Sequence, residues 1–162
     1  QVAKAVGLRI FVTSSSDEKL QQAKNLGADV AVNYKTQDFA REVREITKRR
    51  GVDVVVDSVG GETYAKSLAS LVRGGRLVTC GATAGPRPQT DLQRIFWNQL
   101  SVFGSTMGNM REFAEMLTFM RKRGVKPVID RVFPLPEGAQ ALARLEAGNQ
   151  FGKVVLKVRD GL

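Results

Sequence analysis

The chain has 162 residues, of which 43% are hydrophobic, 25% charged and 7% aromatic, which suits one globular domain with a substantial core. It has no histidine and one cysteine, Cys80, so neither an internal disulfide nor a Ser-His-Asp or Cys-His nucleophile can form within it. A zinc site built from Cys80 and carboxylates would be poor, because stable zinc sites use several Cys or His ligands. The single thiol suits a reducing compartment, and we expect a cytoplasmic protein with no membrane partner.

The net charge is +9, from 25 lysines and arginines against 16 aspartates and glutamates. Such a balance is compatible with nucleic-acid binding, but the basic residues are scattered along predicted helices. They cluster only at 48–50 and 121–123, each at a predicted helix C-terminus, where cations complement the helix dipole. We therefore expect no nucleic-acid partner.

Short apolar strands alternate with amphipathic helices along the chain. We predict strands over residues 9–13, 30–32, 52–57, 76–80, 100–104, 127–133 and 153–158. We predict helices over residues 17–26, 38–48, 62–72, 91–97, 110–123 and 136–147. Strands separated by helices of this length imply right-handed crossovers and a parallel sheet covered on both faces, which is a doubly wound α/β domain.

The periodicity also predicts which side chains are buried. The helix over 62–72 should bury Leu68, Leu71 and Val72 and end at Gly74 and Gly75. The helix over 110–123 has an apolar stripe typical of a core face. That stripe consists of Phe113, Met116, Leu117 and Met120. Cys80 is expected as a small buried strand residue.

The first residues indicate a longer protein. Residues 1–6 have the pattern of the end of a helix, with Val2, Ala3 and Val6 turned inward and Gly7 as its stop. The Gly-x-Gly-x-x-Gly fingerprint that should precede such a helix is absent from the sequence. We expect the chain to be a part that lacks the first strand and the glycine-rich phosphate loop.

Ligands of doubly wound sheets bind beyond the carboxyl ends of the strands, so the residues after each strand are the candidates. These are residues 14–16, 33–34, 57–61, 80–82 and 103–105. Four of these five segments are small or glycine-rich, which permits a ligand to approach the backbone, although glycines that merely end strands would look the same. Asp57 is a lone carboxylate there and is expected to cap backbone rather than act as an acid or base.

Four segments carry a resemblance to a known family. They are QVAKAVGLRIFVTSSSDEKLQQAKNLGADVAVNYKTQDF, GVDVVVDSVGGETYAKSLASLVRGGRLVTCGATAG, QLSVFGSTMGNMREFAEML and the closing FGKVVLKV. In order and spacing they resemble the cofactor domain of the medium-chain dehydrogenase/reductase superfamily, which includes zinc-containing alcohol dehydrogenases and quinone oxidoreductases. The resemblance implies a dinucleotide-binding domain over residues 1–162, without the N-terminal catalytic domain. It implies no catalytic residue and no metal ligand in this chain; zinc, if used, would lie in that other domain.

The resemblance also assigns cofactor contacts. Ser14 stands where NAD-preferring relatives place an acidic residue, so with Ser15, Lys19 and Tyr34 it implies NADP with NAD as the alternative. Two alternative roles remain open: Lys19 is then a solvated helix residue, and Tyr34 a packing residue at the end of a strand. The positions implied along the rest of the cofactor are Ser58, Val59 and Gly60 under the adenosine half, Gly81 and Ala82 near the nicotinamide ribose, and Phe103, Gly104 and Ser105 at the carboxamide.

The implied reaction is hydride transfer between NADP(H) and a carbonyl, alcohol or activated alkene, although this chain by itself is expected to be inactive. Two alternatives remain: a zinc-free NADPH:quinone reductase domain, and a non-catalytic Rossmann-like assembly module. Relatives often dimerise through the last strand of the sheet, which matches Leu100–Met107 and has neither charge nor proline to protect an exposed edge. The absent first strand would lie between the strands at 9–13 and 52–57.

Overall fold

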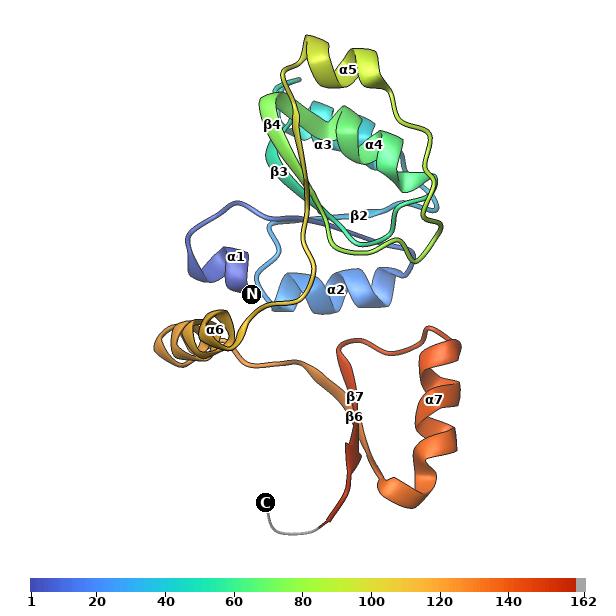
Figure 1. The fold of residues 1–162 in the computed structure, drawn as a ribbon. Coiled ribbons are helices and arrows are strands. Elements are labelled where there is room, and N and C mark those ends of the chain that lie inside the picture. Colours follow the sequence, from blue (N-terminus) through green and yellow to red (C-terminus); the bar gives the residue numbers. More distant parts are fainter. Residues whose placement is uncertain (160–162) are drawn as a thin grey trace.

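The computed structural model describes residues 1–159, in which parallel strands alternate with helices (Figure 1). The strands are β1 (Phe11–Ser14), β2 (Val30–Asn33), β3 (Val52–Asp57), β4 (Leu71–Thr79), β5 (Ser101–Gly104), β6 (Ile129–Pro134) and β7 (Lys153–Lys157). The helices are α1 (Val2–Ala5), α2 (Asp17–Asn25), α3 (Phe39–Ile46), α4 (Thr63–Ser70), α5 (Leu92–Trp97), α6 (Met110–Arg123) and α7 (Gly138–Glu146), with a short 3-10 turn, η1 (Leu135–Glu137), before α7.

All strand pairs in the described residues are parallel, which confirms the predicted α/β class. The strands form three sheets in the orders β1-β2, β3-β4-β5 and β6-β7. The strand orders of the first two sheets match the two halves of a doubly wound sheet, and no strand within residues 1–159 pairs with both β1 and β3. The pair β6-β7 with α7 forms a separate unit, so the seven predicted strands do not share one continuous sheet.

Polar side chains fix the helix starts where the sequence predicts them. Ser16 accepts a hydrogen bond from the backbone at the start of α2, and Asp38 and Asp91 do the same for α3 and α5. Asn109 and Glu112 form a reciprocal capping box on α6. These caps satisfy backbone N–H groups that have no partner inside a helix.

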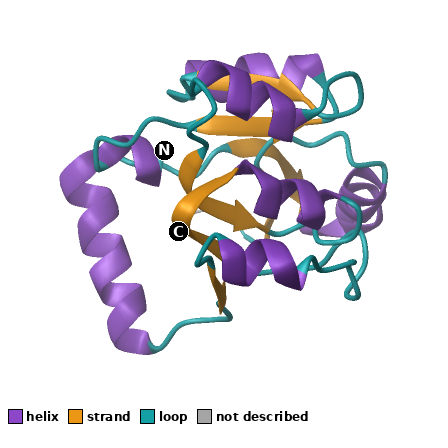
Figure 2. Ribbon diagram, turned by 90° about the horizontal axis from the view of Figure 1, so that it is seen from above, coloured by secondary structure: helices purple, strands orange, loops and turns teal. Residues whose placement is uncertain are grey.

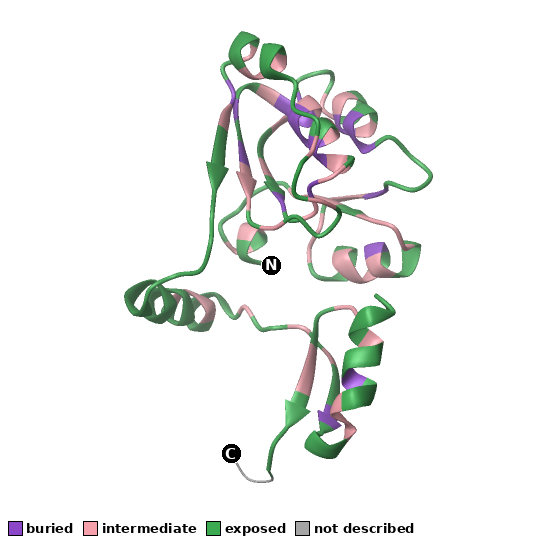
Figure 3. Ribbon diagram, turned by 45° about the vertical axis from the view of Figure 1, so that its right-hand side comes forward, coloured by how far each residue is buried: buried purple, intermediate pink, exposed green. Residues whose placement is uncertain are grey.

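The main core lies between the β3-β4-β5 sheet and the helices α4 and α5. Its buried members are Tyr64, Leu68, Leu71, Leu77 and Leu100. Figure 2 shows helices against the strands of this region, and Figure 3 shows that buried residues are concentrated here. This core holds β3, β4 and β5 together, and with them the loops that follow these strands.

The boundary between α4 and β4 differs from the prediction. The helix ends at Ser70, and Leu71 is extended and pairs with Val52, although it is buried as expected. Gly74 and Gly75 lie inside β4, where the register of pairing with β3 shifts. The prediction was wrong because a buried leucine satisfies the apolar pattern of either a helix end or a strand start.

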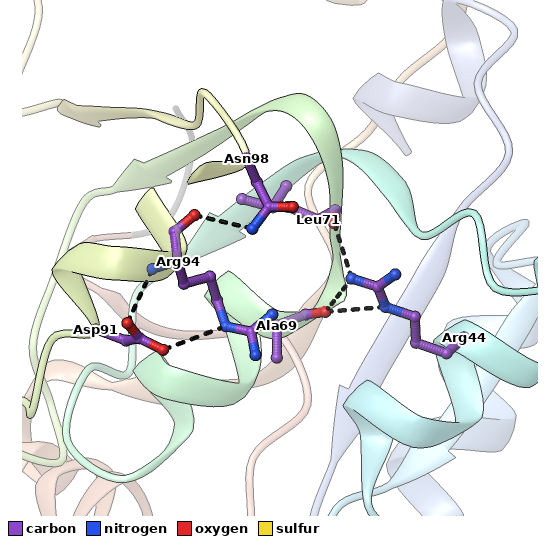
Figure 4. A network of polar contacts seen from close by, with 6 residues as sticks. All are labelled: Arg44, Ala69, Leu71, Asp91, Arg94 and Asn98. Carbon is purple, nitrogen blue, oxygen red and sulfur yellow. Dashed lines mark hydrogen bonds and ion pairs between the residues drawn. The ribbon is translucent and has the colours of Figure 1, made fainter. Parts of the chain in front are cut away.

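An arginine stabilises this boundary (Figure 4). The Arg44 guanidinium on α3 donates to the Ala69 carbonyl at 3.0 and 3.2 Å and to the Leu71 carbonyl at 3.3 Å. The Ala69 carbonyl is in the last turn of α4, where carbonyls lack partners in the helix, and Leu71 is the first residue of β4. Nearby, Arg94 pairs with Asp91 and its carbonyl accepts from the Asn98 amide.

Several predictions of burial were wrong. None of the residues of α6 is buried, and Phe113 of its stripe is 52% exposed, because α6 stands apart from the strands (Figures 1 and 2). Val2 and Val6 of the first helix are also exposed. Cys80 follows the end of β4 and is exposed rather than buried. Within residues 1–159, no helix is both long and apolar enough for a membrane span.

Candidate functional site

The carboxyl ends of the strands are aligned within each sheet. Ser14 of β1 pairs with Asn33 of β2, Asp57 of β3 with Thr79 of β4, and Thr79 with Gly104 of β5. The loops after the strands of each sheet therefore emerge at one edge. The predicted site residues lie on those loops or at the strand ends next to them, except Lys19 on α2.

The loops after β1 and β2 bring Ser14 and Tyr34 together. The Tyr34 N–H donates to the Ser14 carbonyl at 3.1 Å. The Ser14 hydroxyl oxygen accepts from the Ser16 N–H at 3.3 Å, which leaves the hydroxyl hydrogen free to donate. Buried Asn33 supports this corner, because its amide donates to Asp17 at 2.8 Å and its oxygen accepts from the Lys35 N–H at 3.1 Å.

Lys19 lies in the first turn of α2. Its N–H donates to the Ser16 hydroxyl at 3.3 Å, and its ammonium donates to the Gly148 carbonyl just after α7. The sequence could not reveal this second contact, because the two residues are 129 positions apart. Tyr34 is 36% exposed, and no described residue hydrogen-bonds to its hydroxyl. The predicted trio of Ser14, Lys19 and Tyr34 thus has two hydroxyl donors free and an ammonium held by a backbone carbonyl.

Asp57 organises the loop after β3. One of its carboxylate oxygens accepts from the N–H groups of Val59 and Gly60 at 2.8 and 2.9 Å, and the other accepts from the Ser67 hydroxyl at 2.9 Å. The carboxylate is buried. Burial, together with the negative charge of Asp57, raises the pKa of the Tyr64 hydroxyl. These contacts confirm that Asp57 caps backbone, and they fix the direction in which residues 58–60 leave the strand.

The glycines after β3 and β4 allow two loops to pack against each other. A Cβ atom on Gly60 would lie 2.8 Å from the Gly85 carbonyl oxygen, and one on Gly81 would lie 2.9 Å from the Ser58 carbonyl oxygen. The Ala84 N–H donates to the Val59 carbonyl at 2.8 Å across this contact. The sequence predicted that a ligand could approach the backbone at these glycines. In the structure, the atoms that approach them closely belong to the neighbouring loop. Residues 84 and 85 were missed as members of this edge, because their pairing is tertiary.

The loop after β5 is more open. A Cβ atom on Gly104 would meet no atom within 4 Å. Phe103 is exposed, and the Ser105 N–H donates to the Thr79 carbonyl at 2.9 Å. That N–H is therefore occupied, while the Ser105 hydroxyl and carbonyl are available to a ligand. No group of three or more Cys, Asp or Glu residues that could hold a metal ion occurs within residues 1–159.

A cavity of about 890 Å³ lies between β1 and β3. Its walls are largely apolar and include Phe11 and Val56 from the strands and Phe39, Val43 and Ile46 from α3. It also reaches predicted site residues, because Tyr34, Ser58 and Val59 line it. Of the residues predicted under the adenosine half of a cofactor, Ser58 and Val59 thus line this groove and Gly60 does not. The other predicted site residues outside its lining are Ser14, Ser15, Lys19, Gly81, Ala82, Phe103, Gly104 and Ser105.

Comparison with known proteins identifies the family. The family profile described as zinc-binding dehydrogenase matches residues 1–122. The chain is 37% identical to the NAD-dependent alcohol dehydrogenase of Sulfolobus acidocaldarius, over 98% of this chain and 46% of that protein. A crystal structure of an NAD-dependent alcohol dehydrogenase superposes with a TM-score of 0.90 at 38% identity, covering 98% of this chain and 46% of that one.

A mycobacterial structure complexed with NADPH also matches, with a TM-score of 0.80 and 32% identity over 97% of this chain and 52% of that one. The chain spans about half the length of the relatives that it matches. These similarities cover nearly all of the chain, from the first residues to the β6–α7–β7 unit. The chain belongs to the zinc-binding dehydrogenase family.

Proposed function

We propose that this chain is the NADP(H)-binding part of an oxidoreductase that transfers hydride between a nicotinamide and a carbonyl, alcohol or activated alkene. The observation that carries the proposal is the row of small and glycine-containing loops at the carboxyl ends of β3, β4 and β5, in a member of a dehydrogenase family. When bound, the nicotinamide supplies the hydride chemistry. The residues of this chain would hold the cofactor and set its orientation.

Ser14, Lys19 and Tyr34 support NADP over NAD. A carboxylate at position 14 would repel a 2′-phosphate, whereas the Ser14 hydroxyl has a hydrogen free to donate to one. The Tyr34 hydroxyl is a second donor at the same corner. The Lys19 ammonium would exchange the Gly148 carbonyl for the phosphate, a charged acceptor that gives a stronger hydrogen bond. Ser15, beside Ser14, is half-buried and completes the corner.

The remaining contacts would follow the edge of the β3-β4-β5 sheet. Ser58, Val59 and Gly60 would lie under the adenosine half, because two of them line the groove. Gly81 and Ala82 would lie near the nicotinamide ribose. Phe103, Gly104 and Ser105 would meet the carboxamide, and the occupied Ser105 N–H directs that contact to its hydroxyl and carbonyl.

A negative charge introduced at Ser14 tests the preference. In the oxidoreductase that contains this chain, we expect kcat/KM to be higher with NADPH than with NADH. We expect Ser14→Asp to reduce that ratio roughly tenfold to a hundredfold, because a charge-assisted hydrogen bond contributes about 1.5–3 kcal/mol. Thr90→Asp, which adds the same charge at an exposed loop position, should leave the ratio unchanged. Equal or better efficiency with NADH, or an unchanged ratio in Ser14→Asp, would refute the preference.

The unpaired edge of β5 supports a second copy of the chain as a partner. This strand lies at the end of its sheet and exposes Val102 and Phe103, without a nearby charge or proline to discourage pairing. We propose that a second copy pairs with this edge, because a two-fold dimer would satisfy both unpaired edges at once.

A further inference from the structure

An acidic residue, Asp17, lies next to the corner formed by Ser14, Lys19 and Tyr34. It is the first residue of α2, three positions after Ser14, and it is exposed. A 2′-phosphate is mainly dianionic at pH 7, so a carboxylate beside this corner would repel it. The corner thus combines donors that favour the 2′-phosphate of NADP(H) with an acid that opposes it.

Asn33, the last residue of β2, binds this carboxylate. Its side-chain amide donates to an Asp17 oxygen at 2.8 Å. Asn33 is only 8% exposed, and its side-chain oxygen accepts from the Lys35 N–H at 3.1 Å. Its main-chain carbonyl also accepts from the N–H groups of Thr36 and Gln37, at 3.2 and 2.9 Å. A buried amide with several fixed contacts therefore binds an exposed carboxylate.

The strand register places Asn33 beside the residues of the corner. It pairs with Ser14 in the parallel ladder of β1 and β2, and it directly precedes Tyr34 in sequence. The Tyr34 hydroxyl has no partner among the described residues, whereas the Asn33 side chain is buried and bonded to Asp17. Asn33 therefore acts on a ligand at this corner through the Asp17 carboxylate rather than by contact.

We propose that Asn33 is a positioning residue that determines cofactor specificity. Its hydrogen bond compensates part of the Asp17 charge and keeps the carboxylate from rotating toward Ser14 and Tyr34. The inference rests on the proposed NADP(H) site, and it explains how that site tolerates an acid at the start of α2. Such a role affects ligands that carry a 2′-phosphate and spares NAD(H), which has a hydroxyl at that position.

Two small probes test this role without hydride transfer. Adenosine 2′,5′-bisphosphate and AMP differ only in the 2′-phosphate, and calorimetry gives the dissociation constant of each for the oxidoreductase that contains this chain. We expect the unmodified protein to bind the bisphosphate more tightly. Asn33→Ala should reduce this preference roughly threefold to tenfold, the size expected for repulsion between charges at a solvent-exposed site. Its affinity for AMP should stay the same.

Variants of the two acids at the start of α2 identify the group through which Asn33 acts. Asp17→Asn should change the preference little while Asn33 is present, and it should restore the preference when combined with Asn33→Ala. Glu18→Gln removes the same charge at the next residue, which is also exposed but makes no contact with Asn33. It should recover little of the preference in the same combination.

A second substitution at Asn33 covers the case in which alanine impairs folding. Asn33→Asp keeps the size of the side chain and its acceptor for the Lys35 N–H, but it removes the donor to Asp17. The preference should fall at least as far as in Asn33→Ala, because two carboxylates then face each other. Circular dichroism verifies that each variant is folded.

Three results would overturn the role of Asn33. They are an unchanged preference in both Asn33 variants, an equal loss of affinity for the two probes, or a loss that persists when Asp17→Asn is added. The last result would assign the effect to the turn at Lys35 instead of the carboxylate. Equal binding of both probes by the unmodified protein would contradict the NADP(H) preference instead, and Asn33→Ala should then still make the bisphosphate the weaker ligand.

Discussion

Two regions of this molecule have similar local architecture but differ in how they are stabilised. The β3–α4–β4 segment and the β6–α7–β7 segment are both parallel strand pairs joined by a helix. In the first, Leu77 and Leu68 are completely or almost completely buried. In the second, Phe133 and Ala141 are buried, while most apolar residues of α7 and β6 remain exposed. A parallel strand–helix–strand unit can therefore form locally without enclosing a core of its own.

The difference in burial follows from the number of strands and helices that pack together in each region. The β3-β4-β5 sheet has a third strand, and α4 also packs against α3 and α5, so apolar side chains meet from several elements. The β6-β7 pair has two strands and one helix. Its specific contact is polar: Arg144 of α7 donates to both Asp130 carboxylate oxygens at 2.5 and 2.8 Å, and the Phe151 N–H donates to the same carboxylate at 3.0 Å.

Truncating a leucine in each region should give the largest difference between them in lost free energy of unfolding. Leu77→Ala removes a fully buried side chain and should lower the free energy of unfolding by about 2–5 kcal/mol, from lost burial and the cavity left behind. Leu142→Ala on α7, where the side chain is 63% exposed, should cost less than about 0.5 kcal/mol. Urea denaturation followed by circular dichroism measures both. Similar losses would mean that α7 is covered by a partner.

The sheet edges of the two regions should also respond differently to charge. Val102→Lys on β5 introduces a positive charge from each copy at the proposed dimer edge and should weaken the dimer roughly tenfold or more, because like charges across paired strands are unfavourable. Val132→Lys on β6, at a valine of similar exposure, should leave the molar mass of the assembly in solution at that of the dimer. Light scattering at micromolar concentration, with circular dichroism to verify helix content, tests this. A monomeric unmodified oxidoreductase would rule out the β5 edge as a dimer contact.

The sequence predicts what local chemistry determines. Capping residues such as Ser16 and Asp38 mark helix starts, and the valine-rich run of β3 marks a strand, because each depends on neighbours within a few positions. The burial expected for that run was wrong, since Val54 and Val56 are exposed. The end of α4 at Ser70 was missed, because Leu71 is apolar in either conformation. The apolar stripe of α6 predicts a covered face but not which element covers it.

The same distinction applies to the candidate site. The loops after the strands could be located from the sequence, since a parallel sheet brings the carboxyl ends of its strands to one edge. The contact of Lys19 with Gly148 could not, because it joins segments that are distant in sequence. The packing of Gly60 and Gly81 against neighbouring loops was also hidden, since a glycine pattern shows that something approaches closely but not what it is.

The Asp130–Arg144 pair gives the smallest expected effect and one that depends on pH. Hydrogen bonds from the Arg144 guanidinium and the Phe151 N–H lower the pKa of Asp130 from 3.8 to about 2. A carboxyl whose pKa is lower in the folded state stabilises the fold above its unfolded pKa, and this contribution is lost as the pH falls through the folded pKa. Asp130→Asn should therefore be less stable than the unmodified chain at pH 7, and the difference should shrink between about pH 4 and pH 2. Asp53→Asn, at a carboxylate 64% exposed beside Arg50, is the matched control and should show a smaller difference. Urea denaturation at several pH values measures both, and a difference for Asp130→Asn that persists unchanged at pH 2 would show that the carboxylate charge is not what stabilises the β6–α7–β7 unit.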